Sequence, residues 1–243
     1  MGSNEAVVEI DDLRKVYGRV VAVDGISLSV RRGEVFGILG PNGAGKTTTV
    51  ECAAGLRRPD RGRVRVLGRD PQADPAEVRQ HVGVQLQHAV LPDRMKVREA
   101  MAVFAAAYHR TADANALLTD WGLSEHRGTA FKALSGGQKQ RLFIALALLG
   151  EPEVVVLDEL TSGLDPAARR DTWAMVRRLR ERGVTVLLVT HAMDEAESLC
   201  DRLVVVNRGR IVAAGTPDEI RGDHRTLESA YLNLTTPIEE GVR

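Results

Sequence analysis

The interpretation of this chain rests on nine consecutive residues, Gly40-Pro41-Asn42-Gly43-Ala44-Gly45-Lys46-Thr47-Thr48. They follow an apolar run at 35–39 and precede an expected helix at 49–54, which gives the G-x-x-x-x-G-K-T spacing and the strand–loop–helix context of a phosphate-binding loop. The glycines let successive backbone N–H groups point at one anion, and the helix start adds partial positive charge there. A glycine-rich turn that binds nothing is the competing interpretation, and the context disfavours it. We therefore expect the chain to bind a nucleoside triphosphate.

Four polar side chains have individual roles in such a site. Lys46 can reach the β- and γ-phosphates as a point charge, and the Thr47 hydroxyl is placed to ligate Mg²⁺. The apolar run 154–157 ends in Asp158 and Glu159. An Asp at the carboxyl end of such a strand lies beside the phosphate loop, so Asp158 is expected to hold Mg²⁺ through water. Glu159 is then placed to polarise the water that attacks the γ-phosphate. Two carboxylates that merely end a strand at the surface are the weaker interpretation.

Composition limits the class of protein. The 243 residues are 44% hydrophobic and 27% charged, which suits one globular unit with a sizeable core. The formal net charge is zero, so no overall electrostatic attraction to nucleic acid or anionic lipid is expected. The longest apolar runs are too short to span a bilayer, and no signal peptide is visible. Cys52 and Cys200 are far apart in sequence and are expected to be small buried hydrophobic groups in a reducing, cytoplasmic compartment.

The order of the predicted elements indicates an α/β core interrupted by a helical insertion. Strands are predicted at 6–10, 20–30 and 61–66, and the last alternates charge with valine as in a half-exposed antiparallel strand. A short helix is predicted at 74–79, and helical periodicity dominates from about 88 to 150. Strands and helices then alternate, at 154–157, 167–181, 184–189 and 193–199, before a hairpin with strands at 203–206 and 211–214.

A second glycine-containing motif lies in the helical region, at Leu134-Ser135-Gly136-Gly137-Gln138. Alone, Ser-Gly-Gly is most often a flexible linker. Here it directly precedes an amphipathic helix that is predicted to run to Leu149, so it forms a second helix N-terminus with exposed N–H groups. One phosphate loop already serves one nucleotide. The second anion-binding helix start therefore suggests that a partner molecule contributes to each site.

The Leu-Ser-Gly-Gly-Gln motif between the phosphate loop and Asp158-Glu159 resembles the nucleotide-binding subunit of an ABC transporter, over nearly the whole chain to about Ile220. The resemblance implies an ABC ATPase fold, that is, a RecA-like P-loop NTPase core with an antiparallel β subdomain and an inserted helical subdomain. It further implies a single ABC ATPase domain at 1–221, with core segments at 1–86 and 151–221, a helical subdomain at 87–150 and a short tail at 222–243. Two subunits, most simply identical, would pack head to tail around two ATP molecules.

The resemblance also implies roles for single residues. Ser135, Gly136, Gly137 and Gln138 match the signature motif that contacts the γ-phosphate bound to the other subunit. Outside this motif, three residues match further family positions. Tyr17 matches the aromatic residue that stacks on adenine, His191 the switch histidine near the γ-phosphate, and Asp165 the loop at 162–165 that links the two sites. Without the family, Tyr17 would be interpreted as packing on a strand edge and His191 as a structural cap.

Gln87 matches the glutamine that senses Mg²⁺ and faces the membrane subunit. Gln85 lies two residues earlier, and Gln87 is preferred because Gly83 fixes the alignment. Two positions depart from the family pattern. Leu160 replaces the usual proline after the catalytic glutamate, which makes the start of the following loop less rigid. His88 replaces a more usual polar or acidic residue on the membrane-coupling surface.

The end of the chain, at 227–235, resembles the tail of ATPases that serve separately encoded permeases exporting drugs, antibiotics or lipids. The expected function is ATP hydrolysis that powers export from the cytoplasmic side of the membrane. Docking on an integral membrane permease is expected around 88–98, and no nucleic-acid partner is expected. The competing interpretations are an importer subunit, a soluble ABC ATPase that acts on ribosomes or DNA, and a non-hydrolysing regulatory subunit. Glu159 and His191 argue against the last of these.

Overall fold

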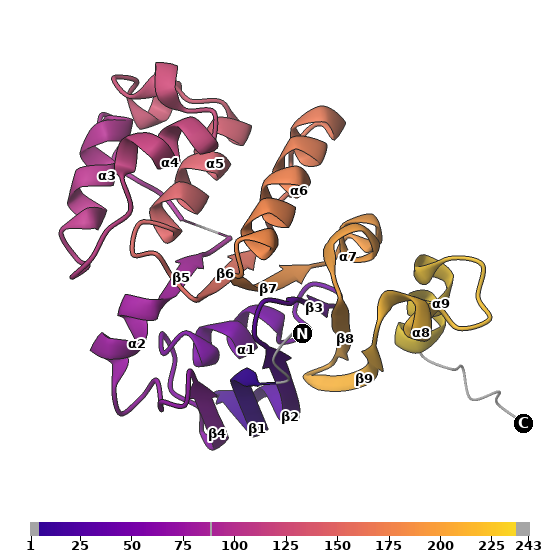
Figure 1. Cartoon of the computed structure of the whole chain (residues 1–243). Helices are drawn as coiled ribbons and strands as arrows, with labels where there is room; N and C mark the ends of the chain where they lie inside the picture. Colours follow the sequence, from indigo (N-terminus) through magenta and orange to yellow (C-terminus); the bar gives the residue numbers. More distant parts are fainter. Residues whose placement is uncertain (1–4, 88, 237–243) are drawn as a thin grey trace, which may run out of the picture.

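The protein is described by a computed structural model that covers residues 5–87 and 89–236. Its centre is a six-stranded sheet (Figure 1). In spatial order the strands are β5 (Val82–Gln85), β6 (Val154–Asp158), β7 (Thr185–Thr190), β3 (Val35–Leu39), β8 (Arg202–Asn207) and β9 (Arg210–Gly215). Neighbouring strands from β5 to β8 are parallel, and β9 runs antiparallel to β8 at one edge. The predicted α/β core is thereby confirmed.

The central strands are continuous apolar runs because both faces of the sheet are covered. Every residue of β3, β6 and β7 is buried. Val35 and Leu39 of β3 pack into the core under the helical layer, whereas Phe36 and Ile38 pack into the core that contains α1 (Lys46–Ala53). A slip of one residue would exchange these two faces, so the alternation fixes the register of β3. It thereby fixes the position of the phosphate loop that follows.

A second, antiparallel sheet of three strands packs against α1, in the order β2 (Val20–Arg31), β1 (Ala6–Tyr17), β4 (Arg61–Val66). The prediction for the first strand was too short, because β1 continues beyond residue 10 to Tyr17. The strand pairing is irregular at Asp12, where φ is 47°. Beyond this point the polar second half of β1 still pairs with β2 and β4. This extension carries Tyr17 to the end of the sheet that faces the phosphate loop.

The helical insertion lies between β5 and β6, on the opposite side of the large sheet from the small one (Figure 1). It contains α3 (Val97–Ala105), α4 (Ala114–Asp120), 3-10 turns at Ser124–His126 and Phe131–Ala133, and α5 (Gly136–Ala147). Just before β5 comes α2 (Pro75–His81). The predicted insertion is thus present, with two differences. Its first helix begins only at Val97, and α5 ends at Ala147, where Leu148 forms the cap, rather than at Leu149.

The last third of the chain adds α6 (Pro166–Glu181), α7 (Met193–Leu199), α8 (Pro217–Arg221) and α9 (Leu227–Thr235). The segment expected to be a short tail contains α9, which buries Leu227, Ala230 and Tyr231. His88 and residues 237–243 lie outside the described residues. Within the two described segments, no helix combines the length and apolar character needed to cross a bilayer. Cys52 and Cys200 are both buried, as expected.

Candidate functional site

The phosphate loop curls tightly from the end of β3 into α1. Gly45 caps α1 with φ 103°, and a Cβ on this residue would lie 2.3 Å from the backbone oxygen of Ala22, so only glycine fits. Because α1 begins at Lys46, the first amide N–H groups of the helix lack acceptors within the helix and face the loop. The arrangement is an anion-binding helix start.

The loop forms one wall of a cavity of about 510 Å³. The cavity is lined by residues from the loop, the small sheet and the ends of two large-sheet strands: Tyr17, Ala22, Asn42, Gly43, Ala44, Gly45, Lys46, Thr47, Thr48, Gln87 and Glu159. Most residues expected at the nucleotide site therefore meet at one place. Gly40 and Pro41 contribute backbone oxygens that accept hydrogen bonds from Lys46.

Lys46 lies buried beneath the loop, with its ammonium held by backbone oxygens. Its Nζ donates to Gly40 O at 2.8 Å and to Pro41 O at 3.1 Å, and it lies 3.9 Å from Glu159 Oε1. Burial lowers the pKa of Lys46, while the carboxylates of Glu159 and Asp158 oppose this shift. The lysine is thus a positioned cation between the loop and the carboxylates.

Asp158 and Thr47 form a pair of oxygen donors under the loop. Thr47 Oγ1 donates to Asp158 Oδ2 at 2.9 Å, whereas Asp158 Oδ1 is buried without a hydrogen-bond partner in the described part of the chain. Burial raises the pKa of Asp158, and the Glu159 carboxylate raises it further, against the effect of the Thr47 hydrogen bond. Mg²⁺ is commonly held by one or two carboxylates together with substrate phosphates. An unsatisfied carboxylate oxygen beside a hydroxyl fits this ion.

Glu159 is the most constrained side chain of the site. It is 7% exposed, and its backbone has φ 56°, a left-handed conformation that costs about 1–3 kcal/mol for a residue other than glycine. Its Oε2 accepts from Ser162 Oγ at 2.7 Å and lies 2.6 Å from His191 Nδ1. The structure therefore joins two predicted site residues from different strands, Glu159 after β6 and His191 after β7.

Tyr17 lies at the mouth of the cavity, with 39% of the residue exposed. The guanidinium carbon of Arg57 is 5.2 Å from the ring centroid, and Arg57 Nε is 2.6 Å from Glu51 Oε2. Such a cation over an aromatic face contributes about 0.5–1 kcal/mol at an exposed position. Sequence reasoning missed Arg57, because no local motif connects it with Tyr17. The contact depends on how α1 packs against the small sheet.

The two glutamines near the end of β5 have different positions. Gln87 is exposed and lines the cavity, whereas Gln85 is 2% exposed and its Nε2 donates to the neighbouring Leu86 O. The structure thus brings Gln87 to the nucleotide site, and Gln85 belongs to the core.

The signature motif does not line this cavity. Ser135 caps α5, where its hydroxyl accepts from Gln138 N at 3.3 Å while Gln138 Oε1 accepts from Ser135 N at 2.8 Å. Gln138 Nε2 also lies 2.8 Å from His126 Nε2. Ser135 and Gly136 are exposed, and Asp165, likewise exposed, caps α6 through Ala167 N and Ala168 N. Within one chain, these residues form an open surface apart from the phosphate loop.

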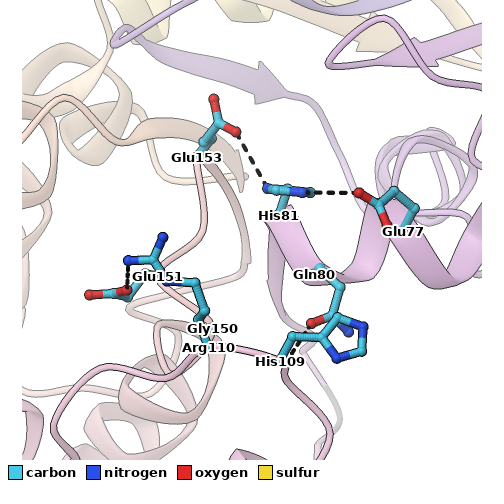
Figure 2. A pocket seen from close by; sticks show the side chains of 8 residues that line it. All are labelled: Glu77, Gln80, His81, His109, Arg110, Gly150, Glu151 and Glu153. Carbon is cyan, nitrogen blue, oxygen red and sulfur yellow. Dashed lines mark hydrogen bonds and ion pairs between the residues drawn. The ribbon is translucent and has the colours of Figure 1, made fainter.

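A second cavity, of about 460 Å³, lies where β5 and β6 begin, between the core and the helical layer (Figure 2). His81 bridges two carboxylates there, with Nε2 3.5 Å from Glu77 Oε1 and Nδ1 3.4 Å from Glu153 Oε1. Open parallel sheets bind ligands at the carboxyl ends of their strands, whereas β5 and β6 begin here. The contacts are those of a polar joint between layers.

The family model described as ABC transporter matches residues 23–162. A daunorubicin resistance ATP-binding protein of Streptomyces coeruleorubidus is 41% identical over 224 residues, which cover 90% of this chain and 71% of that protein. A Nod factor export ATP-binding protein I of Burkholderia orbicola is 43% identical over 229 residues, which cover 92% and 73%. A probable multidrug ABC transporter ATP-binding protein of Escherichia coli is 38% identical, with 95% of this chain but 42% of that protein covered.

Solved structures agree with these relatives. A structure of an ATP-binding subunit of an ABC transporter superposes with a TM-score of 0.85 at 30% identity, and the match covers 94% of this chain and 99% of that one. An ATP-binding cassette in its ADP conformation gives 0.80 at 27% identity, with 94% and 99% covered. The chain therefore belongs to the ATP-binding subunits of ABC transporters, and it is an ATPase.

Proposed function

We propose that this chain powers export through a separate membrane permease, as one of two identical ATPase subunits arranged head to tail on the cytoplasmic side of the membrane. The observation that carries the catalytic part is the convergence of Lys46 and Glu159 on one cavity, with His191 held against Glu159. The relatives named for drug resistance and Nod factor export support the direction of transport. These names favour a drug-like or lipid-like molecule as the substrate exported by this chain.

Each side chain has a task in hydrolysis. The Lys46 ammonium attracts the phosphates, and the exposed face of Tyr17 offers a stacking surface for adenine. Glu159 takes the proton of the attacking water, and its contacts with Ser162 and His191 hold it for that step. A positioned base of this kind contributes about 10²- to 10⁴-fold in rate. Mg²⁺, held by Thr47 and Asp158 with Gln87 close by, would neutralise negative charge on the phosphates.

The pairing of two subunits follows from the exposed signature motif. The start of α5 offers backbone N–H groups and the Ser135 hydroxyl to an anion, yet these residues lie outside the cavity of their own chain. A second copy in head-to-tail orientation would bring them to the γ-phosphate of the first. Asp165, at the exposed start of α6, would then lie near the contact between the subunits.

The permease contact is proposed at 89–98, with His88 preceding it outside the described residues. Val90 is 82% exposed, and the side chains of Arg94 and Arg98 are also exposed. This segment directly follows Gln87, which lines the nucleotide cavity. A change at the γ-phosphate can therefore reach the surface over a short distance. Such coupling requires a partner with different affinity for the two states of the ATPase.

The test is Glu159→Gln, which keeps the shape of the side chain and removes the proton acceptor. We expect ATP hydrolysis to fall by about two orders of magnitude or more, with ATP binding retained and an ATP-dependent dimer visible by light scattering. Glu181→Gln, an exposed position at the end of α6, is the matched control and keeps wild-type turnover. Near-normal turnover of Glu159→Gln would exclude this residue as the base. A monomer under all nucleotide conditions would contradict the paired site.

A further inference from the structure

Glu195 is a buried carboxylate that none of the roles above uses. It lies on α7, four residues after His191, and it is 1% exposed. Burying an ionised carboxylate is costly unless several hydrogen bonds satisfy it. The hydrogen bonds that this carboxylate accepts therefore have to offset the cost of its burial.

The Glu195 carboxylate receives hydrogen bonds from two different segments, the loop after β6 and α6. Thr161 Oγ1 donates to Glu195 Oε1 at 2.9 Å, and Trp173 Nε1 donates to the same oxygen at 3.1 Å. Burial raises the pKa of Glu195, and hydrogen bonds from Thr190, Thr161 and Trp173 oppose that rise. The carboxylate is thus an acceptor shared by two donors, Thr161 and Trp173, that are distant from each other in sequence.

These residues are close in sequence to residues of the site or lie on the same helix as one. Thr161 lies two residues after Glu159, in the loop whose Ser162 hydroxyl also contacts Glu159. Thr190 ends β7 and directly precedes His191. Trp173 lies on α6, the helix that Asp165 caps. One buried carboxylate on α7, the helix that follows His191, therefore connects the loop after β6 with the helix that begins at the proposed subunit contact.

This connection bears on the strained part of the site. Glu159 and His191 come from different strands, yet their side chains approach to 2.6 Å while Glu159 holds a left-handed backbone. Strained conformations persist when the surroundings over-determine them. The hydrogen bonds from Thr161 and Trp173 to Glu195, on the helix that follows His191, supply that constraint from outside the nucleotide cavity, whose lining does not include Glu195.

We propose that Glu195 is a positioning residue for ATP hydrolysis, which holds Glu159 and His191 in register and ties them to α6. The proposal rests on the assignment of Glu159 as the base. It predicts that loss of the shared acceptor slows the chemical step while nucleotide binding persists, because the phosphate loop and Tyr17 are untouched. Misplacement of a reacting group by about 1 Å can cost on the order of 100-fold in rate.

The experiment compares Glu195→Ala and Glu195→Gln in the purified full chain. We expect Glu195→Ala to lower kcat by about 10- to 100-fold with KM for ATP within about twofold of wild type. Glu195→Gln keeps an oxygen that accepts from Thr161 and Trp173, so it restores most of the rate. The matched control is Thr185→Val at the other end of β7. Thr185 is also fully buried, and its hydroxyl accepts from Gly33 N at 3.0 Å, far from the site loops.

Two further measurements keep the proposal testable if Glu195→Ala does not fold. Thr161→Val removes one donor with little change of shape, and it should lower kcat in the wild-type background and by a similar factor in the Glu195→Gln background, where the amide oxygen still accepts this hydrogen bond. In a Trp121→Phe background, Trp173 is the remaining tryptophan of the sequence. Its emission should shift in Glu195→Ala and return toward wild type in Glu195→Gln.

The outcomes distinguish the role of Glu195 from the assignment of Glu159 as the base. If Glu195→Ala lowers the melting temperature as Thr185→Val does but leaves kcat unchanged, Glu195 is merely structural and the proposal fails. A raised KM with unchanged kcat would overturn it equally. Glu159→Gln is measured alongside. If that variant keeps its turnover, the assignment of the base fails, whereas the effect of Glu195 on kcat stands as a separate result.

Discussion

At the level of single residues, the demands of folding and of chemistry conflict most clearly at Asp158. Its side chain is fully buried, one carboxylate oxygen has no partner in the described part of the chain, and the Glu159 carboxylate is close by. A buried charge with incomplete hydrogen bonding destabilises the fold. The Mg²⁺ site proposed above would use that same oxygen, which accounts for the conflict.

We predict that Asp158→Asn makes the nucleotide-free chain more stable while it greatly lowers ATP hydrolysis. A gain of about 1–2 kcal/mol corresponds to roughly 2–8 °C in melting temperature for a chain of this size. The Asp158 pKa is raised in the folded protein, so the penalty is present above the folded pKa and disappears when acid protonates the carboxyl group. The difference in melting temperature should therefore widen as pH rises.

Thermal unfolding followed by dye fluorescence between about pH 5 and 8 measures this effect, with hydrolysis assayed on the same samples. Asp223→Asn, at an exposed position, is the control and should match wild type throughout. A variant at Asp158 that melts below wild type at pH 8 would show that the carboxylate stabilises the fold.

At the level of secondary-structure elements, α5 combines two functions at its N-cap. Ser135 caps the helix in a reciprocal pair with Gln138, and it is also the proposed donor to a phosphate on the partner subunit. Loss of a cap costs about 0.5–2 kcal/mol of stability whatever else the residue does. A variant at Ser135 must therefore be compared with a variant that removes another helix cap of the same kind.

We predict that Ser135→Phe retains nucleotide binding by the monomer, since Lys46 and the loop are intact, but prevents dimer closure and hydrolysis. Thr216→Ala removes the cap of α8, which has the same reciprocal geometry with Glu219. It should lose comparable stability and keep its activity. Fluorescent-nucleotide titration, light scattering and phosphate release distinguish the two variants. A loss of monomer affinity in Ser135→Phe would indicate that the signature acts within one chain.

The elements also show what sequence can predict. Continuous apolar runs predicted β3, β6 and β7, because strands covered on both faces are apolar except at their ends. The full length of β1 was not predicted, since its second half is polar and is held by pairing with β2 and β4. The packing of α9 was missed for a similar reason: burial of Leu227 depends on tertiary contacts.

The candidate site divides in the same way. Residues within short motifs, such as Lys46 and Glu159, could be predicted because their spacing alone encodes the geometry. Arg57 and Glu195 could not, because each acts on a residue from another element and no local spacing records the contact. The roles assigned to Ser135 and Asp165 stay predictions, since they involve a second subunit.

At the level of the whole molecule, the helical layer lies on one face of the large sheet and carries the exposed segment that follows Gln87 (Figure 1). Polar contacts join this layer to the core at the cavity around His81, where His109 N donates to Gln80 Oε1 at 2.9 Å (Figure 2). These half-exposed contacts are individually weak. The polar contacts at this rim therefore add little to the apolar packing that joins the layer to the core.

We predict that charge reversal by Arg94→Glu with Arg98→Glu releases the protein from its membrane partner without loss of basal ATP hydrolysis. Both side chains are exposed and lie outside the nucleotide cavity. Co-purification of the full chain from detergent-solubilised membranes measures the release, with Arg225→Glu as an exposed control that should stay bound. Recovery of ribosomes or DNA ends as the specific partners would contradict the transporter function.

Because both cysteines are buried, the labelling rates of their thiols report how often the native chain opens. Burial raises the pKa of Cys52 to about 11, and it also raises the pKa of Cys200, so neither offers a thiolate at neutral pH. Maleimide labelling must then follow local or global unfolding. Cys52 lies on α1 behind the phosphate loop, and Cys200 follows α7 on the far side of the same sheet, so the two labelling rates time the opening of its two faces separately.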